Sequence, residues 1–259
     1  MNRRVSIAIL AVLLAGSLSM ARAAIVVQNV WHLGEADSPT AVIGQAGDTT
    51  TVDSMGSANL TATGSGTTYA STTVPNSLVG MSFNGTSGYS GSAVLTTTTD
   101  DFGIEIWADP TAYTNATVFY DGNTADSGWG IYQYENEWTL LYGGVILNGV
   151  GAPVTLGTFN DLALVVEGGV ASFYVNGELT GTVSGYTPND PSQYVFIGTD
   201  EAGGNFVGSL DEARIFTFTD GQFSTSDLQY VAPEPSSLVL AGFGGIALAG
   251  WVRRRRAIR

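Results

Sequence analysis

The sequence predicts a single all-β domain, and three observations lead to that prediction. Glycine occurs 34 times and threonine is almost as frequent, and these residues favour turns and strands respectively. Short apolar runs recur between clusters of Gly, Asn, Asp and Pro, which is typical of strands joined by turns. An amphipathic helical period of useful length does not occur. Together these observations favour an antiparallel β-sandwich.

The expected strands are, in chain order, Val27–Leu33, Met81–Phe83, Phe102–Ala108, Thr117–Tyr120, Gly130–Tyr134, Trp138–Tyr142, Leu162–Glu167, Ala171–Val175, Tyr194–Ile197 and Ala213–Phe218. Asn176-Gly177 is the dipeptide of a type I′ turn, so the two strands beside it are expected to form a hairpin. Residues 40–79 are rich in small polar residues and are expected to form loops and edge strands. One short helix is expected from Ser224 to Tyr230, with Asp227 as the capping-box partner of Ser224.

One expected strand shows which of its faces is buried. From Phe102 to Ala108 an apolar residue stands at every second position, and these side chains are expected to face the core. Glu105 and Trp107 lie on the other side of the same strand. The sequence therefore predicts a solvated, concave sheet face that carries a tryptophan.

The charge of the chain is strongly one-sided. It has 9 basic and 23 acidic residues, a formal net charge of -14, and no cysteine. Arg214 is the only arginine or lysine between residues 24 and 252. A surface this acidic repels phosphate backbones, so nucleic-acid binding is excluded, and disulfides and thiolate metal sites are excluded with it. We expect Arg214 to form a structural ion pair with Glu212 or with a nearby acid such as Glu35.

Residues 1–23 have the pattern of a secretory signal peptide. A basic start precedes an apolar run, and Ala21 and Ala23 form the small-x-small cleavage pattern. Cleavage after Ala23 would leave a domain of residues 24–231, exported by the secretion machinery. A membrane anchor is the alternative, but the apolar run is short for that role.

Residues 232–259 have the pattern of a second targeting segment, after the signal peptide. The tripeptide Pro233, Glu234, Pro235 precedes an apolar stretch at 236–252, long enough for one transmembrane helix, and then the cluster Arg253, Arg254, Arg255, Arg256. The cluster predicts that the last residues are cytoplasmic and that the domain lies outside the inner membrane.

This order of features resembles the PEP-CTERM sorting signal of Gram-negative bacteria that make exopolysaccharide. The resemblance implies an exosortase as the partner and processing near Pro233. It also implies a protein that is first anchored in the membrane and then reaches the cell surface or extracellular matrix. A plain tail anchor is the alternative.

Four sequence blocks resemble the LamG-like domains of the concanavalin A-like lectin/glucanase superfamily, and they occur in the family order. The blocks are Trp31–Glu35, Asp101–Trp107, Phe173–Glu178 and Phe206–Phe216. The resemblance implies a two-sheet antiparallel jelly roll. Members of this superfamily bind glycans, proteins or calcium, so the fold leaves the function open.

Glycoside hydrolases of this superfamily use two nearby carboxylates. In the matching strand Glu105 has no such partner at the family spacing. Glu135 and Glu137 would share a face of an unbroken strand, but a solvated strand edge explains them better. His32 is the only histidine, and we expect it to be structural. No catalytic residue is expected.

Five aromatic residues are candidates for stacking on sugar rings, with core packing as the alternative for each. They are Trp107, Trp129, Tyr132, Tyr134 and Trp138. A calcium ion is the one cofactor to consider, because Asp121, Asn123 and Asp126 place oxygen ligands on one loop. Residues 200–205 form a second such loop. Ordinary Asx turns explain both loops better, so no cofactor is expected to be required.

The sequence therefore predicts an exported, surface- or matrix-associated, non-enzymatic binding protein. Its ligand would be a carbohydrate, such as exopolysaccharide, or a surface protein. A glycan-active hydrolase and a structural matrix protein without a discrete ligand are the alternatives.

Overall fold

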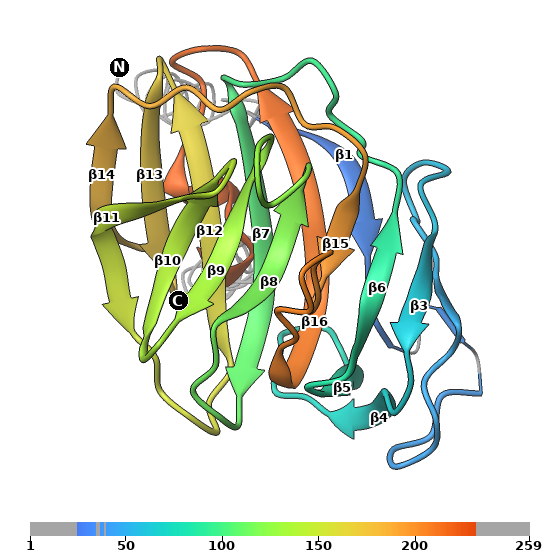
Figure 1. The fold of residues 1–259 in the computed structure, drawn as a ribbon. Coiled ribbons are helices and arrows are strands. Elements are labelled where there is room, and N and C mark those ends of the chain that lie inside the picture. Colours follow the sequence, from blue (N-terminus) through green and yellow to red (C-terminus); the bar gives the residue numbers. More distant parts are fainter. Residues whose placement is uncertain (1–24, 35–36, 39, 232–259) are drawn as a thin grey trace, which may run out of the picture.

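The chain folds into two antiparallel sheets of eight strands each that pack face to face (Figure 1). The computed structural model describes residues 25–34, 37–38 and 40–231. In spatial order, sheet A contains β14 (Glu178–Ser184), β13 (Val170–Val175), β12 (Asn160–Glu167), β7 (Phe102–Pro110), β16 (Val207–Phe218), β5 (Val79–Asn84) and β4 (Thr68–Ser71), with β1 (Ile25–Trp31) also paired to β16. Sheet B contains β11 (Val145–Pro153), β10 (Glu137–Tyr142), β9 (Trp129–Tyr134), β8 (Ala116–Asp121), β15 (Val195–Ile197), β6 (Ser87–Gly91), β3 (Leu60–Gly64) and β2 (Thr50–Thr51). The all-β sandwich expected from the sequence is confirmed.

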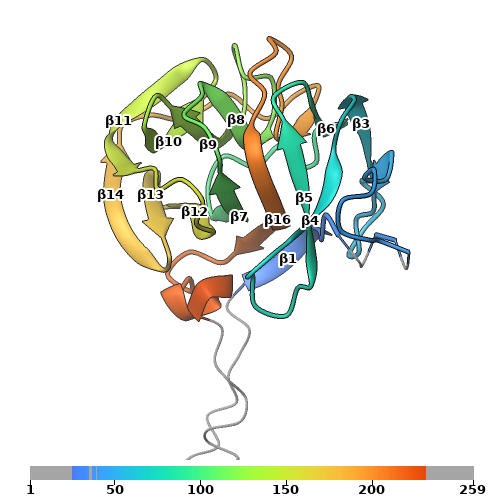
Figure 2. The same cartoon turned by 90° about the horizontal axis from the view of Figure 1, so that it is seen from below.

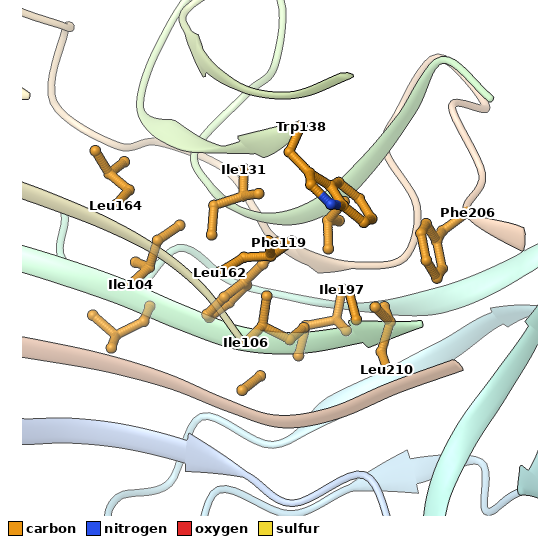
Figure 3. Packing of buried hydrophobic residues seen from close by; sticks show 14 of the residues in the cluster. Ile104, Ile106, Phe119, Ile131, Trp138, Leu162, Leu164, Ile197, Phe206 and Leu210 are labelled. Atoms are coloured by element: carbon orange, nitrogen blue, oxygen red, sulfur yellow. The ribbon is translucent and has the colours of Figure 1, made fainter. Parts of the chain in front are cut away.

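The core lies between the sheets and is filled by alternate side chains of facing strands. Figure 3 shows side chains of sheet A (Ile104, Ile106, Leu162, Leu164) facing side chains of sheet B (Phe119, Ile131, Trp138). Phe102 of β7 stacks on Trp129 of β9 with ring centroids 3.9 Å apart. Each large apolar side chain that is fully buried stabilises the fold by about 1.5–3 kcal/mol, so the two sheets hold each other in place.

The local features expected from the sequence are present. Asn176 and Gly177 have positive φ angles of 53° and 74° and join β13 to β14 as a type I′ turn requires. Residues 40–79 form loops and the short strands β2, β3 and β4, and two of these strands, β2 and β4, are at sheet edges. The turn type could therefore be inferred from the Asn-Gly dipeptide, and the edge strands from the composition of residues 40–79.

The expected C-terminal helix consists of two short 3₁₀ helices, η1 (Thr225–Asp227) and η2 (Gln229–Val231). The capping box is confirmed, because the Ser224 side chain accepts from the backbone of the first turn and Asp227 accepts from the Ser224 backbone. Figure 2 shows both helices on the side of sheet A that faces away from sheet B.

Within the described residues, no helix is long and apolar enough to cross a bilayer. The expected signal peptide (1–23), the Pro-Glu-Pro motif and the expected transmembrane helix (236–252) lie outside those residues.

Candidate functional site

The outer face of sheet A is covered by residues 219–231, which we call the C-terminal cover. Leu228 of the cover is buried in a cluster with Ala163, Val165 and Phe216 of the sheet. Tyr230 lies against Trp107, with ring centroids 5.9 Å apart. Trp107 is therefore only 6% exposed. The expectation of a solvated, tryptophan-bearing face was wrong, because the end of the domain folds back over it.

Glu105 lies beneath the C-terminal cover and is fully buried. It forms an ion pair with Arg214 of the neighbouring strand and also accepts a hydrogen bond from the backbone N–H of Gln229 at 2.7 Å. Arg214 donates to the backbone oxygen of Asp227 at 2.7 Å. One buried ion pair thus ties two strands of sheet A to the cover.

Arg214 forms the expected structural ion pair with a nearby acid, but that acid is Glu105 and not Glu212, and Glu35 lies outside the described residues. The register of β16 against β7 shifts between Asp211 and Arg214, and Glu212 has a positive φ of 50°. This bulge turns the Glu212 side chain away from Arg214 and towards His32. His32 Nδ1 lies 2.9 Å from a Glu212 carboxylate oxygen, and that hydrogen bond raises the pKa of His32. His32 thus has the structural partner that was expected for it.

Asp161 is a second buried carboxyl group beside the Glu105–Arg214 pair. Burial raises the pKa of Asp161 well above its ordinary value, and the negative charge of Glu105 raises it further. Burial raises the pKa of Glu105 as well, although the Arg214 charge opposes this, so two buried carboxyl groups share one cationic partner. The buried polar side chains on this face of sheet A therefore interact with one another and have a structural role.

The outer face of sheet B carries a row of apolar side chains across its strands. Tyr120, Leu141 and Phe196 form a buried cluster, and Tyr132 and Ile146 pack against it. The row is continuous because Gly130, the residue opposite Tyr120, has no side chain; a Cβ there would lie 2.4 Å from the Tyr120 ring. The Tyr120 hydroxyl donates to Ser127 O and accepts from Gly143 N–H, so the ring is fixed in place.

Two tyrosines of β9 face outward next to this layer, and one of them, Tyr132, packs against it. Tyr132 and Tyr134 are two residues apart on β9 and therefore share the outer face. Tyr132 is half-buried and stands opposite Thr117 of β8 and Thr139 of β10, whereas Tyr134 is 42% exposed. We call Tyr132, Tyr134 and the layer beside them (Tyr120, Leu141, Ile146, Phe196) the tyrosine face.

A loop after β15 places two carboxylates beside the tyrosine face. Asp200 accepts from the Thr117 hydroxyl at 3.0 Å and from two backbone N–H groups of its own loop, so its position is fixed. Its charge contributes to raising the pKa of Tyr132, after burial as the larger cause. Glu201 accepts from the Thr124 hydroxyl at 2.8 Å. The border of the face therefore offers hydrogen-bond acceptors.

The five aromatic candidates divide into two groups. Trp129 and Trp138 are fully buried in the core, and Trp107 lies under the C-terminal cover. These three rings have no surface on which a sugar could stack, because they fill the contact between the sheets or between sheet A and its cover. Only Tyr132 and Tyr134 lie together on an outer face.

The three calcium candidates do not converge. Both carboxylate oxygens of Asp121 accept from backbone N–H groups, those of Val94 and Leu95. The Asn123 side chain accepts from Ala125 N–H as an ordinary Asx turn. Among the described residues, no three His, Cys, Asp or Glu side chains are grouped to hold a metal ion. The turn interpretation accounts for Asn123, whereas Asp121 bonds to backbone groups 27 and 26 residues away in the chain.

Sequence reasoning missed Tyr120 and Phe196 as part of a surface layer. The strand of Tyr120 contains a register shift between Thr117 and Phe119, so simple alternation fails there. A glycine at position 130, inside a strand, was the available signal, since such glycines mark a close approach of another group.

Comparison with known proteins supports the fold and the sorting motif at the C-terminus. The family model of the concanavalin A-like lectin/glucanases superfamily matches residues 83–219, and the model of the PEP-CTERM protein-sorting motif matches residues 231–256. This motif marks an exported, secreted protein and implies exosortase-dependent processing. No curated protein sequence matches the chain.

Similar solved structures include domain 4 of an extracellular arabinanase from Geobacillus stearothermophilus in complex with arabinotriose. It is 16% identical, with a TM-score of 0.62, and the match covers 81% of this chain and 99% of that one. The binding domain of Paraclostridial Mosquitocidal Protein 1 is 14% identical, with a TM-score of 0.51 and coverage of 79% and 51%.

A Trypanosoma rangeli sialidase in complex with a difluorinated nononic acid is 13% identical, with a TM-score of 0.51, and covers 79% of this chain. The match spans only 32% of that sialidase and about half of the mosquitocidal protein. At these identities the likeness concerns the fold alone. The family model, by contrast, matches more than half of the sequence, and the chain belongs to the concanavalin A-like lectin/glucanases superfamily.

Proposed function

We propose that this exported protein binds carbohydrate through the tyrosine face of sheet B. The observation that carries the proposal is the pair Tyr132 and Tyr134 on the outer side of one strand, with Tyr132 packed against a buried apolar layer. Tyrosine rings offer an apolar surface for the carbon face of a sugar and a hydroxyl for its polar groups. The neighbouring Asp200 and Glu201 supply acceptors for sugar hydroxyls.

The surroundings of this face support the assignment. The Tyr132 ring is held in place before any ligand arrives, because it stands between two threonines and rests on the buried cluster. A preorganised surface loses little conformational entropy on binding. Domain 4 of the similar arabinanase was solved with arabinotriose, which makes a plant-type or bacterial neutral saccharide a natural first probe.

We propose a binding role without catalysis. Glu105 lies on the strand that matches the carboxylate-bearing strand of the superfamily's glycoside hydrolases. Its carboxylate is buried and already contacts Arg214 and the Gln229 backbone. A hydrolytic carboxylate must reach the glycosidic oxygen. The test is the release of reducing ends from a bound polysaccharide, and sustained release by the pure protein would contradict this part of the proposal.

The same proposal includes the route to the cell surface. The leader (1–23) directs export, the apolar tail (236–252) anchors the protein in the inner membrane, and an exosortase processes it near Pro233. The released domain then associates with exopolysaccharide or with the cell surface. Mass spectrometry of the protein from the culture medium tests this route: the expected chain begins at Ala24 and ends near Pro235.

The binding proposal is tested on a glycan array followed by affinity electrophoresis with the best ligand. We expect Tyr132→Ala to weaken binding at least about tenfold, since loss of one stacking ring costs about 1–2 kcal/mol. Tyr186→Ala is the matched control: this tyrosine is 52% exposed and lies just after β14, an edge strand of sheet A.

Unchanged affinity in Tyr132→Ala, or an equal loss in Tyr186→Ala, would contradict the assignment of the face. Binding is proposed to need no cofactor, so affinity in excess EDTA should equal that in millimolar calcium. An array without any binder would favour the interpretation as a structural matrix protein.

A further inference from the structure

We infer that the ligand of the tyrosine face is a glycan that carries no carboxylate, sulfate or phosphate group. This inference rests on the proposed function and narrows it to a substrate class. The observation behind it is the distribution of charge in the folded domain, where every cationic side chain of the described residues is already paired.

The two cationic side chains are engaged elsewhere. Arg214 is buried on sheet A and forms its ion pair with Glu105. His32 is bound to the Glu212 carboxylate. Neither lies on sheet B, so an acidic sugar on the tyrosine face would meet no arginine, lysine or histidine among the described residues.

The border of the face repels anions as well. Asp200 and Glu201 lie on the loop beside Tyr132, and Glu137 stands directly opposite Tyr134 in the next strand. A sugar carboxylate or sulfate placed there would lose its hydration and gain only like-charge neighbours. Sugar hydroxyls, by contrast, are donors, and they fit the acceptor oxygens of these carboxylates.

Glu201 is the best placed of the three for such a role. One of its oxygens accepts from Thr124 at 2.8 Å, and this contact fixes the carboxylate at the edge of the face. The second oxygen then accepts from a hydroxyl group of the ligand. The same carboxylate that binds a neutral sugar therefore discriminates against an acidic one.

The test uses matched pairs of polysaccharides that differ only in charge. Suitable pairs are hydroxyethyl cellulose with carboxymethyl cellulose and fully methyl-esterified with de-esterified homogalacturonan; neutral arabinan is added as an uncharged probe. Affinity electrophoresis is run at about 20 and 150 mM salt with wild type, Tyr132→Ala and Glu201→Gln. We expect at least one neutral member to bind through Tyr132 and its acidic partner to bind at least about tenfold more weakly at low salt.

The discrimination should shrink at the higher salt, because salt screens like-charge repulsion. It should also shrink in Glu201→Gln, by a factor of about three. Ser226→Ala, an exposed change on the C-terminal cover, is the control and should leave it unchanged.

The possible failures are distinguishable. If an acidic member binds as tightly as its neutral partner and Tyr132→Ala weakens it, the ligand class is wrong while the binding face stands. If glycans bind but Tyr132→Ala has no effect, the face itself is wrong. If no glycan binds in these pairs or on the array, the proposed function and the ligand class are both wrong.

Discussion

The outer faces of the two sheets carry similar kinds of residues and use them differently. On sheet A the carboxyl groups of Glu105 and Asp161 are buried beneath the C-terminal cover beside one arginine, and burial raises the pKa of both. On sheet B the carboxylates of Asp200 and Glu201 stay at the border of an aromatic surface. Charge that is buried on sheet A holds the molecule together, while charge at the edge of sheet B remains available to a ligand.

The difference follows from what the chain places over each face. Residues 219–231 fold onto sheet A, where Leu228 fills an apolar site and two backbone groups of the cover complete the hydrogen bonds of Glu105 and Arg214. Over sheet B, loop residues contact only part of the tyrosine face: the Tyr120 hydroxyl bonds to Ser127 O and Gly143 N–H, and Tyr194 lies against Phe196, whereas Tyr134 stays exposed. Substitutions on sheet A should therefore change stability, and substitutions on the tyrosine face should change binding.

The largest effect is expected from Arg214→Met. The substitution leaves the Glu105 carboxylate buried without its partner, and breaking a buried ion pair in this way costs about 3–5 kcal/mol. Urea unfolding of the exported protein measures it. In the double variant with Glu105→Gln, where no charge remains, most of the loss should be recovered. A cost below about 1 kcal/mol in the single variant would show that Arg214 is not the partner on which Glu105 depends.

The next effect concerns the cover alone. Leu228→Ala removes the buried side chain that attaches the cover to sheet A, and we expect a loss of about 2–3 kcal/mol. Chymotrypsin should then cleave near Phe223 or Tyr230 faster than in wild type. Thr225→Ala, an exposed change in the same segment, is the control. Equal cleavage of all three proteins would mean that the cover is held by other contacts.

The contacts that these two variants remove could not be predicted from the sequence, unlike the local features of the chain. Most of the strands, the Asn176-Gly177 turn and the Ser224 capping box depend on neighbours within a few residues, and they were predicted, whereas β6 and β11 were missed. The cover on sheet A brings Gln229 to Glu105, residues 124 positions apart. The alternation of β7 indicates two faces, but it contains no information on which distant segment lies on the second one.

The candidate site was predicted in part for the same reason. Alternation along β9 separates Trp129 from Tyr132 and Tyr134, so the core tryptophan could have been distinguished from the surface pair. The bulges in β8 and β16 could not be read from the pattern. They decide that Tyr120 faces outward and that Glu212 turns from Arg214 to His32.

A further expected effect is a change in the pH dependence of stability. Because the pKa of Asp161 is raised on folding, the folded protein binds this proton more tightly than the unfolded chain. Proton binding by Asp161 therefore stabilises the folded protein below pH ~4, where the pKa of an ordinary aspartate lies. This stabilisation is lost as the pH rises towards the pKa of Asp161 in the folded state.

Asp161→Asn removes this dependence, so its unfolding free energy should fall less steeply with pH than that of wild type. Asp121, whose pKa burial raises to about 6, contributes a slope of the same sign to both proteins and cancels in the difference. Urea unfolding between pH ~4 and ~8 measures the two profiles. Parallel profiles would show that Asp161 does not carry a proton that is specific to the folded state.

The smallest effect on stability is expected on the tyrosine face, from Tyr134→Ala. Its side chain is 42% exposed and is not part of the buried cluster, so the free energy of unfolding should change by no more than about 0.5 kcal/mol. Tyr120→Phe is the matched comparison within the same face: it removes only a hydroxyl, but that hydroxyl is buried between Ser127 O and Gly143 N–H, so it should cost about 1–3 kcal/mol. If Tyr134→Ala proved the more destabilising of the two, the outer tyrosines would belong to the folded core of sheet B, and their availability to a ligand would have to be abandoned.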